Sequence, residues 1–493
     1  MGNSSNETER ESTSAKPRRR WLRYSLRSLL VLTAVVAVCI GWLFPWYEGA
    51  RLQREIQANH DYVGVGYEEE FDPHSGNSGV PDWLSGILDY HYFYDINQLV
   101  VEKSSDNNLA RLRNLVELKS VGLAIKDQIT AKGFSYLAPL PKLRTVYILW
   151  EITEPGGTDS AADLPGLGQL RQIEDLHLFV PISDASVKEI AQLSRLRKLN
   201  LTSKGEVTEA AFQALGNLSA LESLDLYIED SDERSADAGE HAVDKSHSMA
   251  RVASPSLLFL EKLRKLRSLS IGGRIENYET VVSSLQKLPH LESLTINMPA
   301  RPTLELVKRL EKLTTLRSLS LHYWKTSGAD LGNPRPEDSK NLPEEPLEVS
   351  EADLVRLSNA LNLKYFGVSL HDTQNGSHLN QFTNLEHLLI YGFHRTKSAV
   401  PLQLNLSDKL QMLEFSCMDS LIDADLAQIA QHVRLKELHF YQCNEITDAG
   451  LAKLAKLKTL KHLKVEYCDK VTSAAATALR AAMPNVQIEF EGN

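Results

Sequence analysis

Cysteine is scarce in this chain, because only Cys39, Cys417, Cys443 and Cys468 occur in 493 residues. So few thiols exclude the disulfide framework that stabilises small secreted domains. The last three are spaced 26 and 25 residues apart, and we expect them to form a buried ladder at one position of successive structural units. Such a column lacks the fourth ligand of a zinc site, and rungs about 4.8 Å apart do not match disulfide geometry.

Net positive charge is absent beyond the first 27 residues, where acidic residues outnumber basic ones. The formal net charge is −10, and because residues 1–27 carry +4, the remainder carries −14. An acidic body is a poor surface for neutralising phosphates, so we expect no nucleic-acid partner.

Motifs for catalysis are also missing. Gly64 and Gly66 are followed by neither a third glycine nor a helix pattern, and the sequence has no serine elbow or zinc-protease helix motif. We therefore expect no enzymatic activity, no small-molecule cofactor and no metal site.

One long uncharged run is present, the twenty residues from Ser28 to Tyr47. As a helix, such a run rises about 30 Å, which matches the hydrocarbon core of a bilayer. Tryptophan and tyrosine flank both ends, and five arginines precede the run, so the positive-inside rule places the N-terminus in the cytoplasm. We predict a disordered basic cytoplasmic tail at 1–20, a single-pass cell-membrane anchor at 21–47, and an extracytoplasmic remainder.

A cleaved signal peptide is the main alternative to a retained anchor, since it also has a basic segment before an apolar one. The flank after the run is aromatic where cleavage prefers small residues, and Val38 before Cys39 fits a lipoprotein processing site poorly. A buried helix of a soluble domain is the third interpretation.

A motif of the form L-x-x-L-x-L recurs along most of the chain, and repeats of this length indicate a solenoid. Leu435 to Phe440 returns as Leu460 to Val465, twenty-five residues later. We count fourteen strand starts, at Ile96, Leu115, Leu143, Ile173, Leu196, Leu221, Leu266, Leu291, Leu316, Leu363, Leu385, Leu410, Leu435 and Leu460, and Val486 to Phe490 looks like a last, capping strand.

The two halves of each repeat have different periods. The motif alternates as a strand does, whereas the residues from Ile446 to Leu457 have helical spacing behind Thr447 or Asp448 as N-cap. One strand and one helix cannot bury their apolar sides alone, so stacked repeats share a core. We predict an α/β leucine-rich repeat solenoid, with a parallel concave sheet and outer helices, over 96–493.

These motifs resemble known families. The segment from Leu435 to Leu457, with Cys443 after the strand, is similar to the cysteine-containing, ribonuclease-inhibitor-like class of leucine-rich repeats. The opening from Arg19 to Leu30 resembles the membrane-anchoring start of many planctomycete leucine-rich repeat proteins, and Tyr62 to Glu68 loosely matches a strand that follows it there. This resemblance implies a single-pass membrane protein and no known activity.

Both ends and two interruptions of the array have expected roles. We assign 48–95 to a juxtamembrane segment and N-terminal cap, with Trp83 and Leu84 among the residues that cover the first repeat. Insertions near 229–254 and 325–351 each hold seven acidic and three basic residues, and we expect flexible loops beside the concave face. They are neutral loops or flaps that contribute to binding.

Residues two, four and six after each strand start should point into the concavity. Large aromatic and imidazole side chains gather there at both ends, whereas the middle is rich in serine and threonine. Aromatic residues on a rigid sheet are typical of binding surfaces. The predicted ligand-binding residues are Tyr147, His177, Phe179, Tyr227, His387, Tyr391, His439, Tyr441 and His462.

A cluster of Glu414, Glu437, His439 and His462 on three neighbouring strands could bind a metal ion. Side chains at i and i+2 of a strand lie about 6.5–7 Å apart, which we judge too loose for a preformed site.

The favoured function is a membrane-tethered module that binds a protein or cell-envelope polymer. The alternative is a structural envelope spacer that packs laterally without a specific ligand. An intracellular adaptor like those of ubiquitin ligases is disfavoured by the predicted anchor.

Overall fold

The computed structural model describes residues 50–56, 58, 62–66 and 96–492, with internal gaps at 126–128, 151–162, 181, 205–206, 230–253, 274, 276, 299–301, 324–350, 372–375, 395–401, 405–406 and 433. The chain forms two compact units, 1–56 with 72–94, and 57–71 with 95–493. Of the first unit only helical residues 50–56 are described, with an ion pair between Arg51 and Glu55.

Several predicted segments lie outside the described residues: the tail, the anchor at 21–47, most of the cap including Trp83 and Leu84, and nearly all of both insertions. Within the described part of the chain, no helix is long and apolar enough to cross a membrane.

The second unit is built on one sheet whose sixteen strands follow one another in sequence order. β1 pairs with β2 in antiparallel fashion, and β2 to β16 are parallel. The predicted α/β solenoid with a parallel sheet is therefore confirmed. The strands are β1 (Tyr62–Gly66), β2 (Gln98–Val101), β3 (Ser120–Ile125), β4 (Thr145–Trp150), β5 (Asp175–Phe179), β6 (Lys198–Lys204), β7 (Ser223–Glu229), β8 (Ser268–Gly273), β9 (Ser293–Met298), β10 (Ser318–Tyr323), β11 (Tyr365–His371), β12 (His387–His394), β13 (Met412–Ser416), β14 (Glu437–Tyr441), β15 (His462–Glu466) and β16 (Gln487–Glu491).

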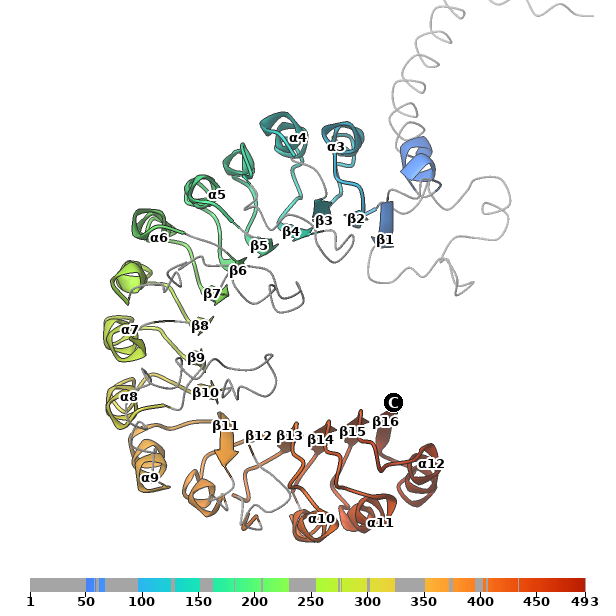
Figure 1. Ribbon diagram of the computed structural model, residues 1–493. Helices are drawn as coiled ribbons and strands as arrows, with labels where there is room; N and C mark the ends of the chain where they lie inside the picture. Colours follow the sequence, from blue (N-terminus) through green and yellow to red (C-terminus); the bar gives the residue numbers. More distant parts are fainter. Residues whose placement is uncertain are drawn as a thin grey trace, which may run out of the picture. The chain divides into compact units, whose positions relative to one another are not determined.

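The helices of this unit lie along its outer side and the sheet along its inner side (Figure 1). Some repeats use a short 3-10 helix, labelled η, in place of an α-helix. The helices are α3 (Asp106–Leu112), α4 (Ala131–Leu137), η2 (Leu167–Gln169), α5 (Asp184–Ile190), α6 (Glu209–Leu215), η4 (Ser254–Lys262), α7 (Tyr278–Leu285), α8 (Leu304–Leu310), α9 (Glu351–Ala360), η5 (Ser377–Gln381), α10 (Asp423–Ile429), α11 (Asp448–Ala452), η6 (Lys453–Lys456) and α12 (Ser473–Ala482).

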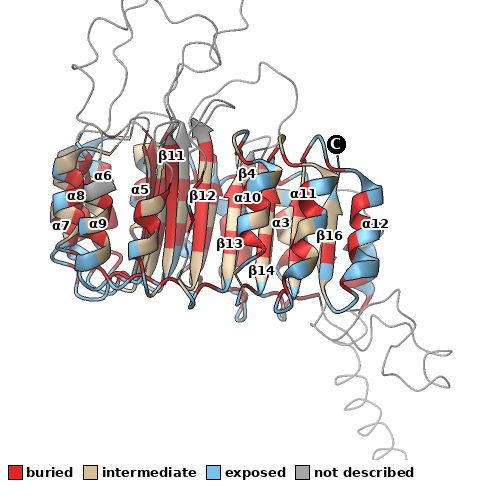
Figure 2. Ribbon diagram, turned by 90° about the horizontal axis from the view of Figure 1, so that it is seen from below, coloured by how far each residue is buried: buried red, intermediate tan, exposed pale blue. Residues whose placement is uncertain are grey.

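The core lies between the sheet and the helices. Buried and half-buried residues alternate along strands such as β13 and β15, so one face of the sheet packs inward (Figure 2). Equivalent core residues stack from repeat to repeat, for example the rings of Phe415 and Phe440 with centroids 5.8 Å apart. Burial of this shared row is what a single repeat cannot achieve.

A ladder of side-chain hydrogen bonds joins successive helix starts. Thr447, the predicted N-cap, does cap α11, and its backbone N–H and hydroxyl both donate to Asp423 of the preceding repeat, at 2.8 and 2.7 Å. The same pair of bonds joins Asp448 to Thr472. Gly450 leaves room for this carboxylate, because an added Cβ would lie 2.2 Å from Asp423 Oδ1. Thr447, Asp448 and Gly450 belong to the run T-D-A-G-L at 447–451, and this run therefore connects one repeat to the next.

The structure corrects one strand start. Ser120 pairs with Thr145, so the repeat of β3 begins at Leu118 and not at Leu115. Both leucines are buried, and the three-residue spacing between them imitates the first half of the motif. The spacings on either side become 22 and 25 residues, close to the rest of the array.

The predicted three-cysteine ladder is wrong at one residue. Cys417, Gln442 and Tyr467 share a left-handed backbone conformation, with φ near +50°, at spacings of 25 residues. The buried position that follows each of them is held by Met418, Cys443 and Cys468. The ladder is therefore two cysteines deep, and Cys468 Sγ accepts a hydrogen bond from the Cys443 backbone N–H at 3.4 Å.

Candidate ligand-binding face

The sheet has one face against the helices and one face turned away from them, which we call the open face. Its positions are the strand residues that alternate with the core residues, most of them half-buried or exposed, and the parallel register aligns them in rows across the strands. All nine predicted ligand-binding residues occupy such positions. The structure gathers them into separate groups.

Near the start of the array, Tyr147, His177 and Phe179 form what we call the aromatic cluster. Tyr147 and His177 are partners in the register of β4 and β5, and their rings stack with centroids 4.5 Å apart and an interplanar angle of 11°. Phe179 follows His177 on the same face and is 43% exposed. Burial lowers the pKa of His177, which favours the neutral imidazole of a flat, uncharged platform.

Tyr227 does not join the aromatic cluster. It lies in the same row as Phe179 but two strands further along, with Thr202 between them. Strand spacing puts the two backbones about 10 Å apart. Tyr227 packs instead over Gly272 of the next strand, where an added Cβ would meet its ring.

In the middle of the open face, Ser320, His322, Tyr365 and Tyr391 form a central cluster. His322 Nε2 and Ser320 Oγ are hydrogen-bonded at 2.6 Å, and the ring of His322 meets that of Tyr391 edge-on at 4.0 Å. Burial lowers the pKa of His322 to about 4. Ser320 is only 2% exposed, and His322 Nδ1 has no hydrogen-bond partner among the described residues, so this pair lacks the access and the third group of a nucleophilic site.

Near the end of the array lies the histidine–glutamate cluster, which comprises His387, Glu414, Glu437, His439, His462 and Glu489. His387 Nε2 donates to Glu414 Oε2 at 3.1 Å, and His439 Nδ1 lies 3.9 Å from Glu414 Oε1. The hydrogen bond from His387 and the neighbouring imidazole of His439 lower the pKa of Glu414 to about 2. His462 Nε2 lies 3.2 Å from Glu489 Oε1.

Beside this cluster the open face is aromatic and acidic. Tyr441 is 38% exposed, and its ring meets Tyr467 edge-on at 5.7 Å. Glu466 and Glu491 lie in the same row, and Lys464 is paired with Glu466 at 2.9 Å. Carboxylates therefore outnumber cations here.

Sequence reasoning missed His322 and Tyr365 as members of the face. They lie six residues after Leu316 and two after Leu363, so the rule that found the others includes them. Tyr467 lies outside the rule because its backbone has φ of 51° just past the strand end.

The chain was compared with known proteins. No protein-family model matches it, and no curated protein matches it. Among solved structures, a leucine-rich repeat protein of Leptospira interrogans is 18% identical, and the match covers 77% of this chain and 92% of that one, with a TM-score of 0.28. Internalin C2 of Listeria monocytogenes is also 18% identical, and the match covers 46% of this chain and 80% of that one, with a TM-score of 0.27. TLR13 in its complex with ssRNA13 is 14% identical, and the match covers 78% of this chain and 54% of that one, with a TM-score of 0.38.

Of these three neighbours, the protein of Leptospira interrogans is named as a leucine-rich repeat protein. Their TM-scores are all below 0.5, so the function is argued from the side chains of the open face alone.

Proposed function

We propose that this protein is a protein-interaction module that binds its partner through the open face of the repeat array. One observation supports this most strongly. Among the described residues, six large hydrophobic side chains are exposed, and the three aromatic ones, Tyr147, Phe179 and Tyr441, all lie on the open face. The others, Val116, Leu258 and Ile422, lie outside its strands. Aromatic rings on a rigid surface offer contact area at low entropic cost.

The two ends of the face suit different parts of a partner. The aromatic cluster is flat and mostly uncharged, so it fits an apolar or aromatic anchor. The region around Tyr441 carries an excess of carboxylates, so it fits lysine or arginine of the partner. The two regions lie nine strands apart, from Phe179 on β5 to Tyr441 on β14, so a partner that contacts both is a folded domain or an extended segment.

The proposal extends to the location of the array. We infer that the run at 21–47 is a retained single-pass anchor, as in the planctomycete proteins that the opening resembles, with the N-terminus cytoplasmic and the array extracytoplasmic. Its support is the twenty-residue uncharged run, which five arginines precede, whereas residues 48–55 after it carry no net charge. Protease added to intact cells should remove the array and spare an N-terminal tag. A tag that is digested while the array survives would reverse the orientation.

Site-specific photo-crosslinking tests the binding face. The full chain would carry a photoreactive phenylalanine analogue at position 179, and in the matched control at Leu258, which is also exposed but lies on η4 of the outer side. We expect a discrete protein adduct from position 179 only. Equal adducts from both positions, or none from 179, would contradict the proposal. A carbohydrate adduct from 179 would identify an envelope polymer as the ligand instead.

Alanine substitutions test the contribution of the rings to affinity. Interface aromatics commonly contribute more than 1 kcal/mol each, so Tyr147→Ala with Phe179→Ala should weaken binding of the captured partner about 30-fold or more. Leu258→Ala is the control and should change the affinity little. Self-association of the full chain that survives the double substitution, with no partner captured, would favour the structural spacer.

A further inference from the structure

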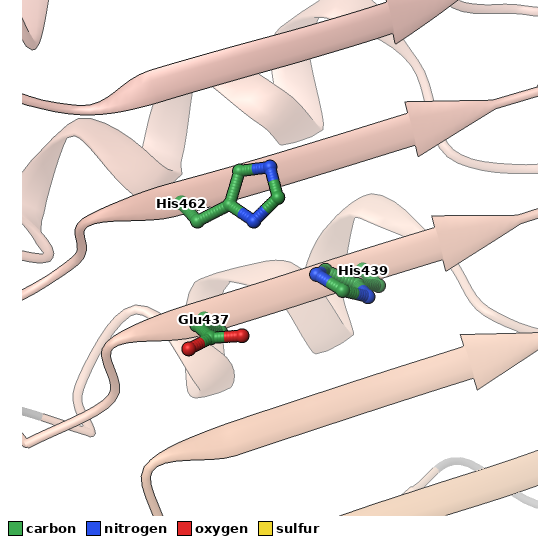
Figure 3. Close-up of side chains that lie close together, drawn as sticks. All are labelled: Glu437, His439 and His462. Atoms are coloured by element: carbon green, nitrogen blue, oxygen red, sulfur yellow. The ribbon is translucent and has the colours of Figure 1, made fainter. Parts of the chain in front are cut away.

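Three potential metal ligands meet on two neighbouring strands within the histidine–glutamate cluster. Glu437 and His439 lie on β14 and His462 on β15, and all three side chains rise from the same face of the sheet (Figure 3). One donor atom from each residue lies within 4.8 Å of the other two. This is closer than the backbone spacing along one strand implies, and the parallel register adds His462 as the direct partner of Glu437.

Each imidazole of this group has a ring nitrogen that is available to bind a metal ion. Nε2 of His439 and Nε2 of His462 are both shielded from solvent and make no hydrogen bond with any described residue. The 3.2 Å approach of His462 Nε2 to Glu489 is close enough for an ion pair, but its direction does not satisfy a hydrogen bond. A shielded ring nitrogen without a partner is costly, and a cation beside it would remove that cost.

A second carboxylate lies beside one of the rings. Glu414 Oε1 faces Nδ1 of His439, and its other oxygen is held by His387. Histidines that bind metals commonly have a carboxylate on the second ring nitrogen, which fixes the tautomer and increases the basicity of the nitrogen that binds the ion. Glu414 therefore occupies the position of an orienting residue for Nε2 of His439.

We propose that Glu437, His439 and His462 bind a divalent transition-metal ion, for which Zn²⁺ is the best match. Two imidazoles and one carboxylate are donors that Zn²⁺ accepts readily, whereas Mg²⁺ and Ca²⁺ prefer oxygen alone. Three protein ligands leave one position of a tetrahedral site open. The proposal is independent of the binding function proposed above.

The site must close around the ion. Ligand atoms of a tetrahedral zinc site lie about 3.3 Å apart, so the three ligand atoms have to approach one another by up to about 1.5 Å. Glu437 is exposed and His439 and His462 are half-buried. Side-chain rotation can supply this movement without a change in the strands.

Calorimetric titration of the full chain with Zn²⁺ tests the site, after treatment with a chelator and its removal. We expect one tight site, which His439→Ala and His462→Ala each weaken by at least about 100-fold. Glu414→Gln should weaken it about 10- to 100-fold, as orienting residues typically do. His177→Ala is the matched control, because it removes an imidazole from the same face far from the cluster, and it should leave the affinity unchanged.

Cobalt provides a second measurement. Co²⁺ bound to nitrogen and oxygen donors in a tetrahedral site has intense visible absorption, so the wild-type chain should develop this spectrum at one equivalent and the variant with both His439→Ala and His462→Ala should not. Thermal unfolding without metal shows whether each variant folds, and Glu437→Gln, which keeps the side-chain volume, serves if the alanine variants do not.

Zn²⁺ should raise the melting temperature of the wild-type chain and not that of the folded variants. The proposal would be overturned if the wild-type chain bound Zn²⁺ no more tightly than the variant with both His439→Ala and His462→Ala. Unchanged Zn²⁺ affinity in Glu437→Gln and His439→Ala would overturn it as well. The polar network would then be a set of histidine–glutamate pairs alone.

Discussion

Protonation of His322 should destabilise the centre of the array. This imidazole lies on β10 against Ser320 and Tyr391, and burial lowers its pKa from 6.5 to about 4. In the unfolded chain the same group titrates near its ordinary value. The unfolded chain therefore binds the proton more tightly than the folded chain between these two values, and stability falls as the pH drops from 6.5 to 4.

The size of the effect follows from the shift. A difference of about 2.5 pKa units, at 1.36 kcal/mol per unit, corresponds to about 3 kcal/mol. The whole contribution is present above pH 6.5, is lost progressively down to pH 4, and does not change further below that. His322→Gln stays neutral at every pH, so it should lack this dependence.

The measurement has to be local, because long repeat arrays need not unfold as one unit. Hydrogen exchange of β10 to β12 at pH 7 and pH 4.5, corrected for the intrinsic pH dependence of exchange, compares the opening free energies. We expect a marked loss in the wild-type chain and little in His322→Gln, with the exposed His290→Gln behaving as wild type. An equal loss in His322→Gln, or an NMR titration of His322 near pH 6.5, would refute the reasoning.

Three further predictions concern the carboxyl-terminal repeats. Asp423→Ala removes the acceptor of two hydrogen bonds from Thr447 and should lower the free energy of unfolding in denaturant by about 1–3 kcal/mol. Alanine at the exposed Asp469 is the control and should lower it little. Equal losses in the two variants would contradict the ladder. Phe415→Ala empties a fully buried ring site stacked on Phe440 and should cost about 3–5 kcal/mol by the same measurement, with a cost under about 1 kcal/mol contradicting the packing. The ionised carboxylate of Glu414 stabilises the fold above pH 4.5, and this contribution is lost as the pH falls toward 2. The free energy of unfolding of Glu414→Gln should therefore fall less in acid than that of the wild-type chain. An unchanged pH dependence in this variant would show that the imidazoles do not stabilise the carboxylate.

The repeat pattern predicted the strands well. The L-x-x-L-x-L motif placed the described strands of the array, and the only start that needed correction was Leu115, where two leucines three residues apart both reach the core. The helices were less regular than the pattern implied, since η2, η4 and η5 take the place of an α-helix in three of the described repeats.

Contacts across strands could not be read from the pattern. Spacing along β14 suggested that Glu437 and His439 lie too far apart to share an ion. In the structure one potential ligand atom of each lies within 4.8 Å of the other and of His462, which the parallel register sets directly beside Glu437. The same register separates Tyr227 from Phe179, although both were predicted for one surface.

By itself, the sequence determined the period of the array, the face on which each strand residue lies, and the residue types offered by the open face. These depend on local chemistry, because alternation in a strand and capping of a helix need only neighbouring residues. Tertiary structure decided which side chains touch: Tyr147 stacks on His177, His322 meets Tyr391, and Glu414 lies between His387 and His439. The physical reason is that lateral strand pairing joins residues 22 to 47 positions apart, and a shift of one residue in that pairing would give every side chain a different neighbour.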